Sequence, residues 1–277
     1  MIPVAFDYKK ASTVDEALAV LLSGDGKLLA GGYSLIPALK LRLNQPAMLV
    51  DIANIPTLKG IREADGEIII GAATTHDDIL QNVTIREKLP FFASAAAMIG
   101  DVQVRNRGTI GGSLAHADPA ADWPALVLAA DATIVIKGSA GIRTAAAADF
   151  FTGLFSTQLD DKEIITAIRI PVPEAGSKMV YLKFSQPASR FAIAGCAVLR
   201  LPSGKTNIAF AGVADTVFRD TAAEQVISGK SLDAATIDAA VNVAINGVSV
   251  MSDHFASEDY RRHLAKVYLR KALLAIA

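Results

Sequence analysis

Two short segments place adjacent glycines beside hydroxyl side chains, and both could bind an anion. They are Ala30-Gly-Gly-Tyr-Ser34 and Thr109-Ile-Gly-Gly-Ser113. Glycine adopts positive φ angles and exposes its N–H without a Cβ in the way, and successive N–H groups in a tight turn can cradle a phosphate. Neither segment has the glycine pattern of a Rossmann fold or a P-loop. Each alone could be an ordinary turn, but together they predict a diphosphate site.

The single cysteine limits the chemistry that this chain can hold. Cys196 is the only one, which excludes an intrachain disulfide. An iron–sulfur cluster, which takes about four cysteine ligands, is excluded from this chain, as is a cysteine-rich zinc site. Cys196 lies in the apolar run 191–199. We therefore expect a small buried hydrophobe rather than a nucleophile.

The histidines and acids do not form a convincing metal or catalytic set. His116, Asp118 and Asp122 have a spacing that suits no single face of a helix, so no metal site is predicted. His76 precedes two aspartates, and we expect a solvated helix start there rather than an acid–base pair. No catalytic residue is predicted on this chain.

Composition and charge narrow the class of protein. The 277 residues carry 27 basic and 28 acidic side chains, which is not the footprint of a nucleic-acid binder. The chain is 52% hydrophobic, which excludes disorder and favours a partner surface. No uninterrupted apolar run approaches the roughly 18 residues of a membrane helix. Residues 1–7 lack the features of a signal peptide, so we expect a cytoplasmic protein.

Apolar runs and turn residues predict the elements of the first 170 residues. Thr13 reads as the N-cap of a helix over 14–22. A second helix is expected over 36–43, and others start near 75, 91 and 123. The segment 104–119, with its second glycine pair, lies between the last two of these helices. Strands are expected over 27–30, 48–52, 67–71, 133–137 and 163–170.

A proline-rich segment predicts a domain boundary. Pro171-Val-Pro-Glu-Ala-Gly176 is followed by three strand signals, over 181–184, 193–201 and 207–212. They predict a small antiparallel sheet. Because helices over 221–228, 234–246 and 257–277 come after the strands, the second domain should be of the α+β class.

Three segments carry a family resemblance. Residues 28–37, 105–120 and 260–273 together resemble the FAD-binding medium subunit of the molybdenum hydroxylases, the carbon monoxide dehydrogenase and xanthine dehydrogenase family. The resemblance implies an α+β protein with a vanillyl-alcohol-oxidase-type FAD-binding domain over 1–176, built of two α/β subdomains (about 1–56 and 57–176). A C-terminal domain over 177–277 should contain a three-stranded antiparallel sheet and helices.

The same resemblance implies which residues surround the FAD. Ile99 matches an apolar position beside the flavin, and Asp122 matches an acid on the adenosine side. Ile165 and Lys183 match positions near the isoalloxazine ring, where a lysine would stabilise reduced, anionic flavin; a solvated surface lysine is the alternative. The residues implied around the diphosphate and ribityl chain are Leu28, Leu29, Ala30, Gly31, Gly32, Tyr33, Ser34 and Leu35, together with Thr109, Ile110, Gly111, Gly112 and Ser113.

Two features depart from the family pattern or stay open. The ring of Tyr33 could stack on the flavin or cover the loop. The segment 185–190 lacks the acid that the family places beside Arg190, so the role of this segment cannot be carried over.

The implied function is electron transfer within a complex. A small iron–sulfur subunit and a large molybdenum-cofactor subunit would be the partners, in a dimer of heterotrimers, and an external acceptor would take electrons from the FAD. The protein would bind, orient and tune the flavin. A stand-alone flavin oxidase or reductase and a non-enzymatic binding module are the alternatives. The substrate and the acceptor (NAD, a quinone or a cytochrome) stay open.

Overall fold

The N-terminal residues form a small parallel sheet. The computed structural model describes residues 1–277. Helix α1 (Val14–Ser23) packs against this sheet through apolar side chains, and the hydroxyl of Thr13 caps it as predicted. The first glycine pair joins the sheet to helix α2 (Leu35–Lys40). The central strand pairs in parallel with both neighbours, in the order β1 (Asp7–Lys10), β3 (Met48–Asp51), β2 (Gly26–Leu29).

The middle of the chain forms a five-stranded antiparallel sheet, reached through the short helix η1 (Pro56–Leu58). The strands predicted over 67–71, 133–137 and 163–170 are present. The sheet also has two edge strands, β4 and β7, which the sequence analysis did not predict because neither contains an apolar run. The spatial order is β4 (Ile61–Ala64), β5 (Glu67–Gly71), β10 (Ile164–Pro171), β6 (Thr133–Gly138), β7 (Gly141–Ala146). The hairpin β8 (Phe151–Gly153) and β9 (Ser156–Thr157) lies apart from this sheet.

Seven helices accompany this sheet, and one of them corrects an expectation. The second glycine pair does not form a loop, because α7 begins at Ile110 and contains both glycines. Trp123 and its neighbours in α8 are buried on all sides. The helices are α3 (His76–Gln81), α4 (Val83–Lys88), α5 (Pro90–Met98), α6 (Val102–Arg105), α7 (Ile110–His116), α8 (Asp122–Ala129) and α9 (Ala147–Phe150).

The C-terminal sheet is antiparallel as predicted but has four strands rather than three. The extra strand is the two-residue β14, too short to leave a pattern in the sequence. Three helices follow the sheet, α10 (Thr221–Ile227), α11 (Ala234–Val243) and α12 (Glu258–Ala275). The strand order is β11 (Lys178–Ser185), β12 (Ala192–Arg200), β13 (Thr206–Ala211), β14 (Phe218–Arg219).

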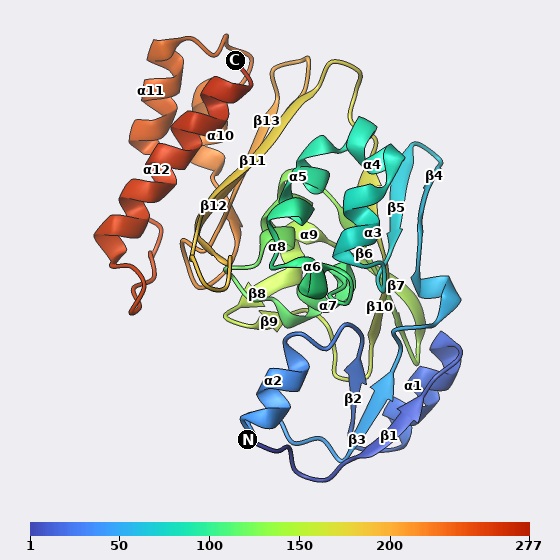
Figure 1. Cartoon of the computed structure of the whole chain (residues 1–277). Helices are drawn as coiled ribbons and strands as arrows, with labels where there is room; N and C mark the ends of the chain where they lie inside the picture. Colours follow the sequence, from blue (N-terminus) through green and yellow to red (C-terminus); the bar gives the residue numbers. More distant parts are fainter.

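Both faces of the C-terminal sheet are covered, which explains its uninterrupted apolar sequence. Helices α10 to α12 lie on one face (Figure 1). On the other face, α5 and α8 contact β11 to β13. Residues of this face, among them Tyr181 and Ala209, belong to the same apolar core as Trp123 and Phe92. The two parts of the chain therefore share a continuous core.

The expected α+β class is confirmed by this architecture. None of the helices combines the length and the apolar character needed to cross a bilayer.

Candidate functional site

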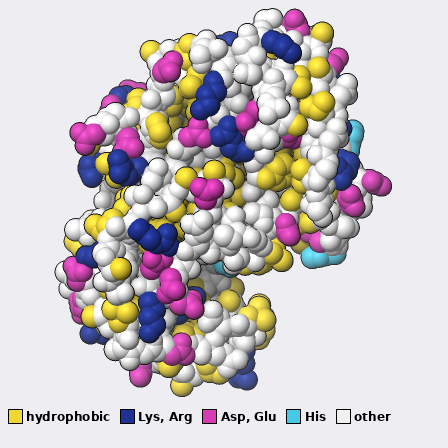
Figure 2. Space-filling model, turned by 180° about the vertical axis from the view of Figure 1, so that it is seen from behind, with side chains coloured by type: hydrophobic (Ala, Val, Ile, Leu, Met, Phe, Trp, Pro, Cys, Tyr) yellow, Lys and Arg dark blue, Asp and Glu magenta, His cyan; other side chains and the backbone are white.

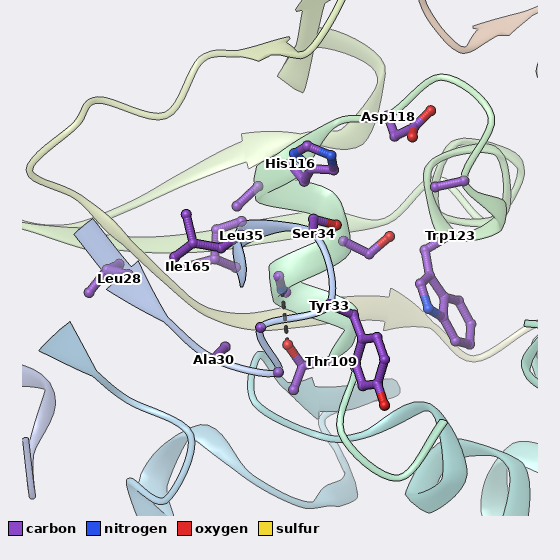
Figure 3. A pocket seen from close by; sticks show the side chains of 18 of the residues that line it. Leu28, Ala30, Tyr33, Ser34, Leu35, Thr109, His116, Asp118, Trp123 and Ile165 are labelled. Atoms are coloured by element: carbon purple, nitrogen blue, oxygen red, sulfur yellow. Dashed lines mark hydrogen bonds between the residues drawn. The ribbon is translucent and has the colours of Figure 1, made fainter. Parts of the chain in front are cut away.

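A cavity of about 630 Å³ opens between the N-terminal sheet and the middle of the chain. The space-filling view shows the hollow above the lower lobe, which the N-terminal residues form (Figure 2). Helix α7, strand β10 and the turn 189–191 contribute to the wall. Most residues expected around FAD line it, and several are drawn in Figure 3. The exceptions are Leu29, Ile110 and Lys183, which do not line the cavity.

The first glycine pair leaves a row of backbone donors free. The N–H groups of residues 31–34 have no acceptor within the chain. Gly32 has a φ of +82°, the left-handed region that favours glycine. Gly31 lies so close to the second segment that a Cβ there would be 2.3 Å from the carbonyl oxygen of Arg107. This segment is therefore built for close approach, and its free amides can receive an anion.

The backbone N–H groups of the second glycine pair, unlike those of the first, have acceptors within the chain. The N–H of Gly111 donates to Ala72 at 2.9 Å, and that of Gly112 donates to the Thr109 hydroxyl at 3.2 Å. Neither glycine has a positive φ. The expectation of a turn with free amides is therefore wrong for this segment. Gly111 serves packing instead, since a Cβ there would lie 2.5 Å from the Cβ of Ala72.

His76 lines the cavity, although the sequence places it at a solvated helix start. It is 6% exposed, and its Nδ1 accepts a hydrogen bond of 3.0 Å from the indole N–H of Trp123. Burial, with a smaller effect of Arg105, lowers the pKa of His76 to about 4. The local sequence held no signal for this, because the partner lies 47 residues away.

Asp122 and Lys183 form a buried ion pair. The Lys183 ammonium lies 2.9 Å from one carboxylate oxygen of Asp122, and the hydroxyl of Tyr181 donates to the other oxygen at 2.5 Å. Burial raises the pKa of the Asp122 carboxyl against the opposing effect of Lys183, and burial also raises that of Tyr181. Asp122 belongs to α8 and lines the cavity, whereas Lys183 belongs to the C-terminal sheet.

The same ammonium holds the turn that closes one side of the cavity. Lys183 Nζ donates to the carbonyl oxygens of Arg190 at 2.6 Å and Met98 at 3.2 Å. Arg190 has a φ of +62°, and its guanidinium donates to the carbonyl oxygen of Gly100 at 2.8 Å. The Arg190 guanidinium therefore has the carbonyl oxygen of Gly100 as its acceptor, where the family has an acidic side chain.

Two further polar residues line the cavity near α7. Desolvation lowers the pKa of His116 and raises that of Asp118. Figure 3 shows their side chains next to the end of α7. No group of three or more histidine, cysteine or acidic side chains has the arrangement of a metal site.

Tyr33 is 44% exposed and lines the cavity from the first loop. Figure 3 shows its ring beyond the glycines, at the side of the cavity where Trp123 lies. It is therefore free to contact a ligand.

Cys196 is buried in β12, as predicted, and burial raises the pKa of its thiol.

Family models cover nearly the whole chain. Residues 4–173 match the FAD binding domain in molybdopterin dehydrogenase, and residues 179–276 match the CO dehydrogenase flavoprotein C-terminal domain. Among curated relatives, the carbon monoxide dehydrogenase medium chain of Hydrogenophaga pseudoflava is 40% identical over 99% of this chain and 98% of its own length. The glyceraldehyde dehydrogenase medium chain of Sulfolobus acidocaldarius is 37% identical over the full length of both.

Solved structures give the same picture. A chain of the Hydrogenophaga pseudoflava carbon monoxide dehydrogenase that lacks the Mo-pyranopterin moiety superposes with a TM-score of 0.96, at 41% identity over 100% of this chain and 98% of that one. A chain of quinoline 2-oxidoreductase from Pseudomonas putida 86 gives 0.93, at 32% identity over 100% and 98%. This chain therefore belongs to the FAD-binding medium chains of the carbon monoxide dehydrogenase and xanthine dehydrogenase family.

Proposed function

We propose that the chain holds one FAD non-covalently in the cavity and relays electrons from iron–sulfur clusters of a partner to an external acceptor. The observation that carries the proposal is the row of free N–H groups over residues 31–34, on a segment where glycine permits close approach. The bound flavin supplies the redox chemistry, and the protein supplies binding, orientation and electrostatics.

The cavity offers free backbone N–H groups and apolar side chains that suit the diphosphate and the rings of FAD. The free amides of the first loop would take the diphosphate, together with the hydroxyls of Ser34 and Ser113. Ile99 and Ile165 would give the flavin ring an apolar wall, and Tyr33 would contact the cofactor from the loop. Leu28, Ala30, Leu35 and Thr109 would complete the lining around the diphosphate and ribityl chain. Leu29, Ile110 and Lys183 would act without lining the cavity.

Asp122 would face the cofactor while bonded to Lys183 and Tyr181. The two residues that the resemblance assigns to opposite ends of the FAD, Asp122 and Lys183, therefore lie side by side at the same part of the cavity. Because Lys183 already has three acceptors, its effect on the flavin would come from the position of the turn 189–191, not from direct contact.

We also propose the subunit arrangement. A small subunit would carry the iron–sulfur clusters and a large one the molybdenum cofactor, in a dimer of heterotrimers. The single buried cysteine supports this, since a cluster bound to cysteines cannot reside on this chain. The names of the relatives, which are medium chains of dehydrogenases, support it as well.

Acid precipitation of the purified chain tests the cofactor. We expect FAD in the yellow supernatant and a colourless pellet, because no covalent link is expected. FMN in the supernatant, or colour that stays with the pellet, would contradict the proposal.

Anaerobic absorbance tests the electron path. The flavin band of the native complex should bleach when carbon monoxide, a purine, an aldehyde or an N-heterocycle that reduces its clusters is added. A complex carrying Gly31→Ala should show reduced clusters and no flavin band. Bleaching of the isolated chain by such a substrate would instead indicate a self-sufficient flavoenzyme. If the clusters become reduced while the flavin stays oxidised, the FAD does not lie on the path of electron transfer.

A further inference from the structure

One side chain of the cavity has an unused hydrogen-bond donor. His76 is the first residue of α3, and the backbone bridge between Thr75 and Thr109 holds it beside the second glycine segment. Its Nδ1 accepts the indole N–H of Trp123, whereas Nε2 has no partner in the chain. The imidazole edge lies directly over Gly108, where a Cβ would be 2.6 Å from Nε2. Gly108 also lines the cavity.

The indole fixes the position of the histidine proton. An indole nitrogen can only donate, so Nδ1 of His76 must present its lone pair. A neutral imidazole carries its proton on the other nitrogen, which is Nε2. Protonation of both nitrogens would turn two N–H groups of the pair toward each other, and burial opposes the charge as well. His76 is therefore a neutral donor through Nε2.

This donor is open to the cavity. The unpartnered side-chain atoms that are sealed inside the protein are Arg105 Nε, Ser177 Oγ and Arg261 Nε. Nε2 of His76 is not among them, although the residue is only 6% exposed. A buried donor without an acceptor costs stability. Because His76 lines the cavity, an acceptor for Nε2–H can come from a molecule bound there.

We propose that His76 donates its Nε2–H to an acceptor atom of the bound FAD and that Trp123 is a positioning residue, because its indole holds the imidazole in this tautomer. The proposal rests on FAD occupying the cavity. It adds His76, a residue outside the two glycine segments, to the residues that contact the cofactor. It also gives a reason for glycine at 108, since any side chain there would displace the imidazole.

Nuclear magnetic resonance of the protein with ¹⁵N-labelled histidine tests the tautomer directly. We expect the proton of His76 on Nε2, with Nδ1 unprotonated, both with and without FAD. Addition of FAD should shift the Nε2–H signal and slow its exchange with water. A proton on Nδ1, or a signal that FAD does not move, would overturn the proposal. This measurement needs no variant and therefore does not depend on whether one folds.

Two substitutions test the contact by its effect on affinity. His76→Gln keeps an N–H donor near the position of Nε2, whereas His76→Phe keeps the bulk and removes both this donor and the acceptor of the Trp123 indole N–H. We expect the Kd of FAD, from flavin fluorescence, to rise about tenfold in His76→Phe, the effect of one lost hydrogen bond. In His76→Gln it should stay near the wild-type value. Equal affinities of wild type and His76→Phe would overturn the proposal.

A matched control separates lost contact from lost stability. Phe150→Leu weakens the same apolar core without touching the cavity, so its Kd should not change. Trp123→Phe removes the donor that fixes the tautomer, together with part of a fully buried ring, and the histidine signals should then report a mixture of tautomers. If wild-type protein yields no FAD on acid precipitation, the proposed function fails. If it yields FAD but the His76 signals do not change when FAD is added, only this inference fails.

Discussion

Replacing Lys183 by methionine removes the positive charge from a buried joint between the FAD-binding part and the C-terminal sheet. Its side chain is 0% exposed, and that of Asp122 is 5% exposed. Methionine fills a similar volume, so the main loss is electrostatic. The carboxylate keeps only the Tyr181 hydroxyl, and the carbonyl oxygens of Met98 and Arg190 lose a donor.

The size of the loss follows from the burial of the pair. Breaking a buried ion pair by removing one partner costs about 3–5 kcal/mol, because an uncompensated charge stays behind. Replacing both partners by neutral groups costs much less. We therefore expect Lys183→Met to lower the free energy of unfolding by about 4 kcal/mol at pH 8. Lys183→Met combined with Asp122→Leu should recover most of it.

The loss should also depend on pH, with a definite sign. Burial already raises the pKa of the Asp122 carboxyl, and removal of the ammonium raises it further. The folded variant then holds a proton that the unfolded chain releases above a pKa of about 3.9. Stability of the variant therefore falls as the pH rises through the interval between these two pKa values. At pH 5 the loss should be smaller than at pH 8.

Urea unfolding followed by fluorescence measures the effect. Trp123 is the only tryptophan and follows Asp122 directly, so its emission reports the joint. The exposed Lys10, which forms no ion pair, provides the control variant Lys10→Met and should change stability by less than about 0.5 kcal/mol. A loss below about 1 kcal/mol for Lys183→Met at pH 8 would refute this account of a buried charge left unpaired. A double variant as unstable as the single one would refute it too.

Further outcomes are expected at the glycine segments and the cysteine. Gly31→Ala should lose FAD on gel filtration, because its Cβ would collide with a carbonyl oxygen, whereas Gly24→Ala, with nothing within 4 Å of its Cβ, should bind FAD normally; equal flavin content in both would be contrary evidence. Thr109→Ala should lower the free energy of unfolding by about 1 kcal/mol through loss of the α7 cap, measured by urea titration; an unchanged midpoint would show that the cap is dispensable. Cys196 should react with a thiol reagent only in denaturant, because its thiol is buried and its pKa raised; rapid reaction of the folded protein would disprove this.

The sequence predicted those parts of the fold that local patterns determine. The strands around Ile68, Ile134 and Val198 come from apolar runs, and their positions are confirmed. Helix α7 was not predictable, because two glycines cost about 1 kcal/mol each in a helix. Packing against Ala72 stabilises it instead. The two-residue strand β14 has no pattern at all.

The site residues likewise divide into those that a local sequence pattern identifies and those that it does not. The first glycine pair lies in one short segment, and its residues could be named from the sequence. The bond between His76 and Trp123 and that between Asp122 and Lys183 join residues 47 and 61 positions apart. The resemblance marked Asp122 and Lys183 as neighbours of FAD but did not indicate that they bind each other. Such pairings depend on the packed structure, which a local pattern does not contain.

The position of α8 also has a consequence for how the protein is made. This helix begins with Asp122, lines the cavity there, and contacts the C-terminal sheet. The ribosome synthesises α8 well before β11 to β13, so the emerging chain has an uncovered apolar helix and an Asp122 without its lysine. The wall of the cavity includes residues 189–191, which connect β11 to β12, so it is incomplete until these residues have been synthesised. The complete cavity therefore forms only after β11 and the residues that follow it have left the ribosome.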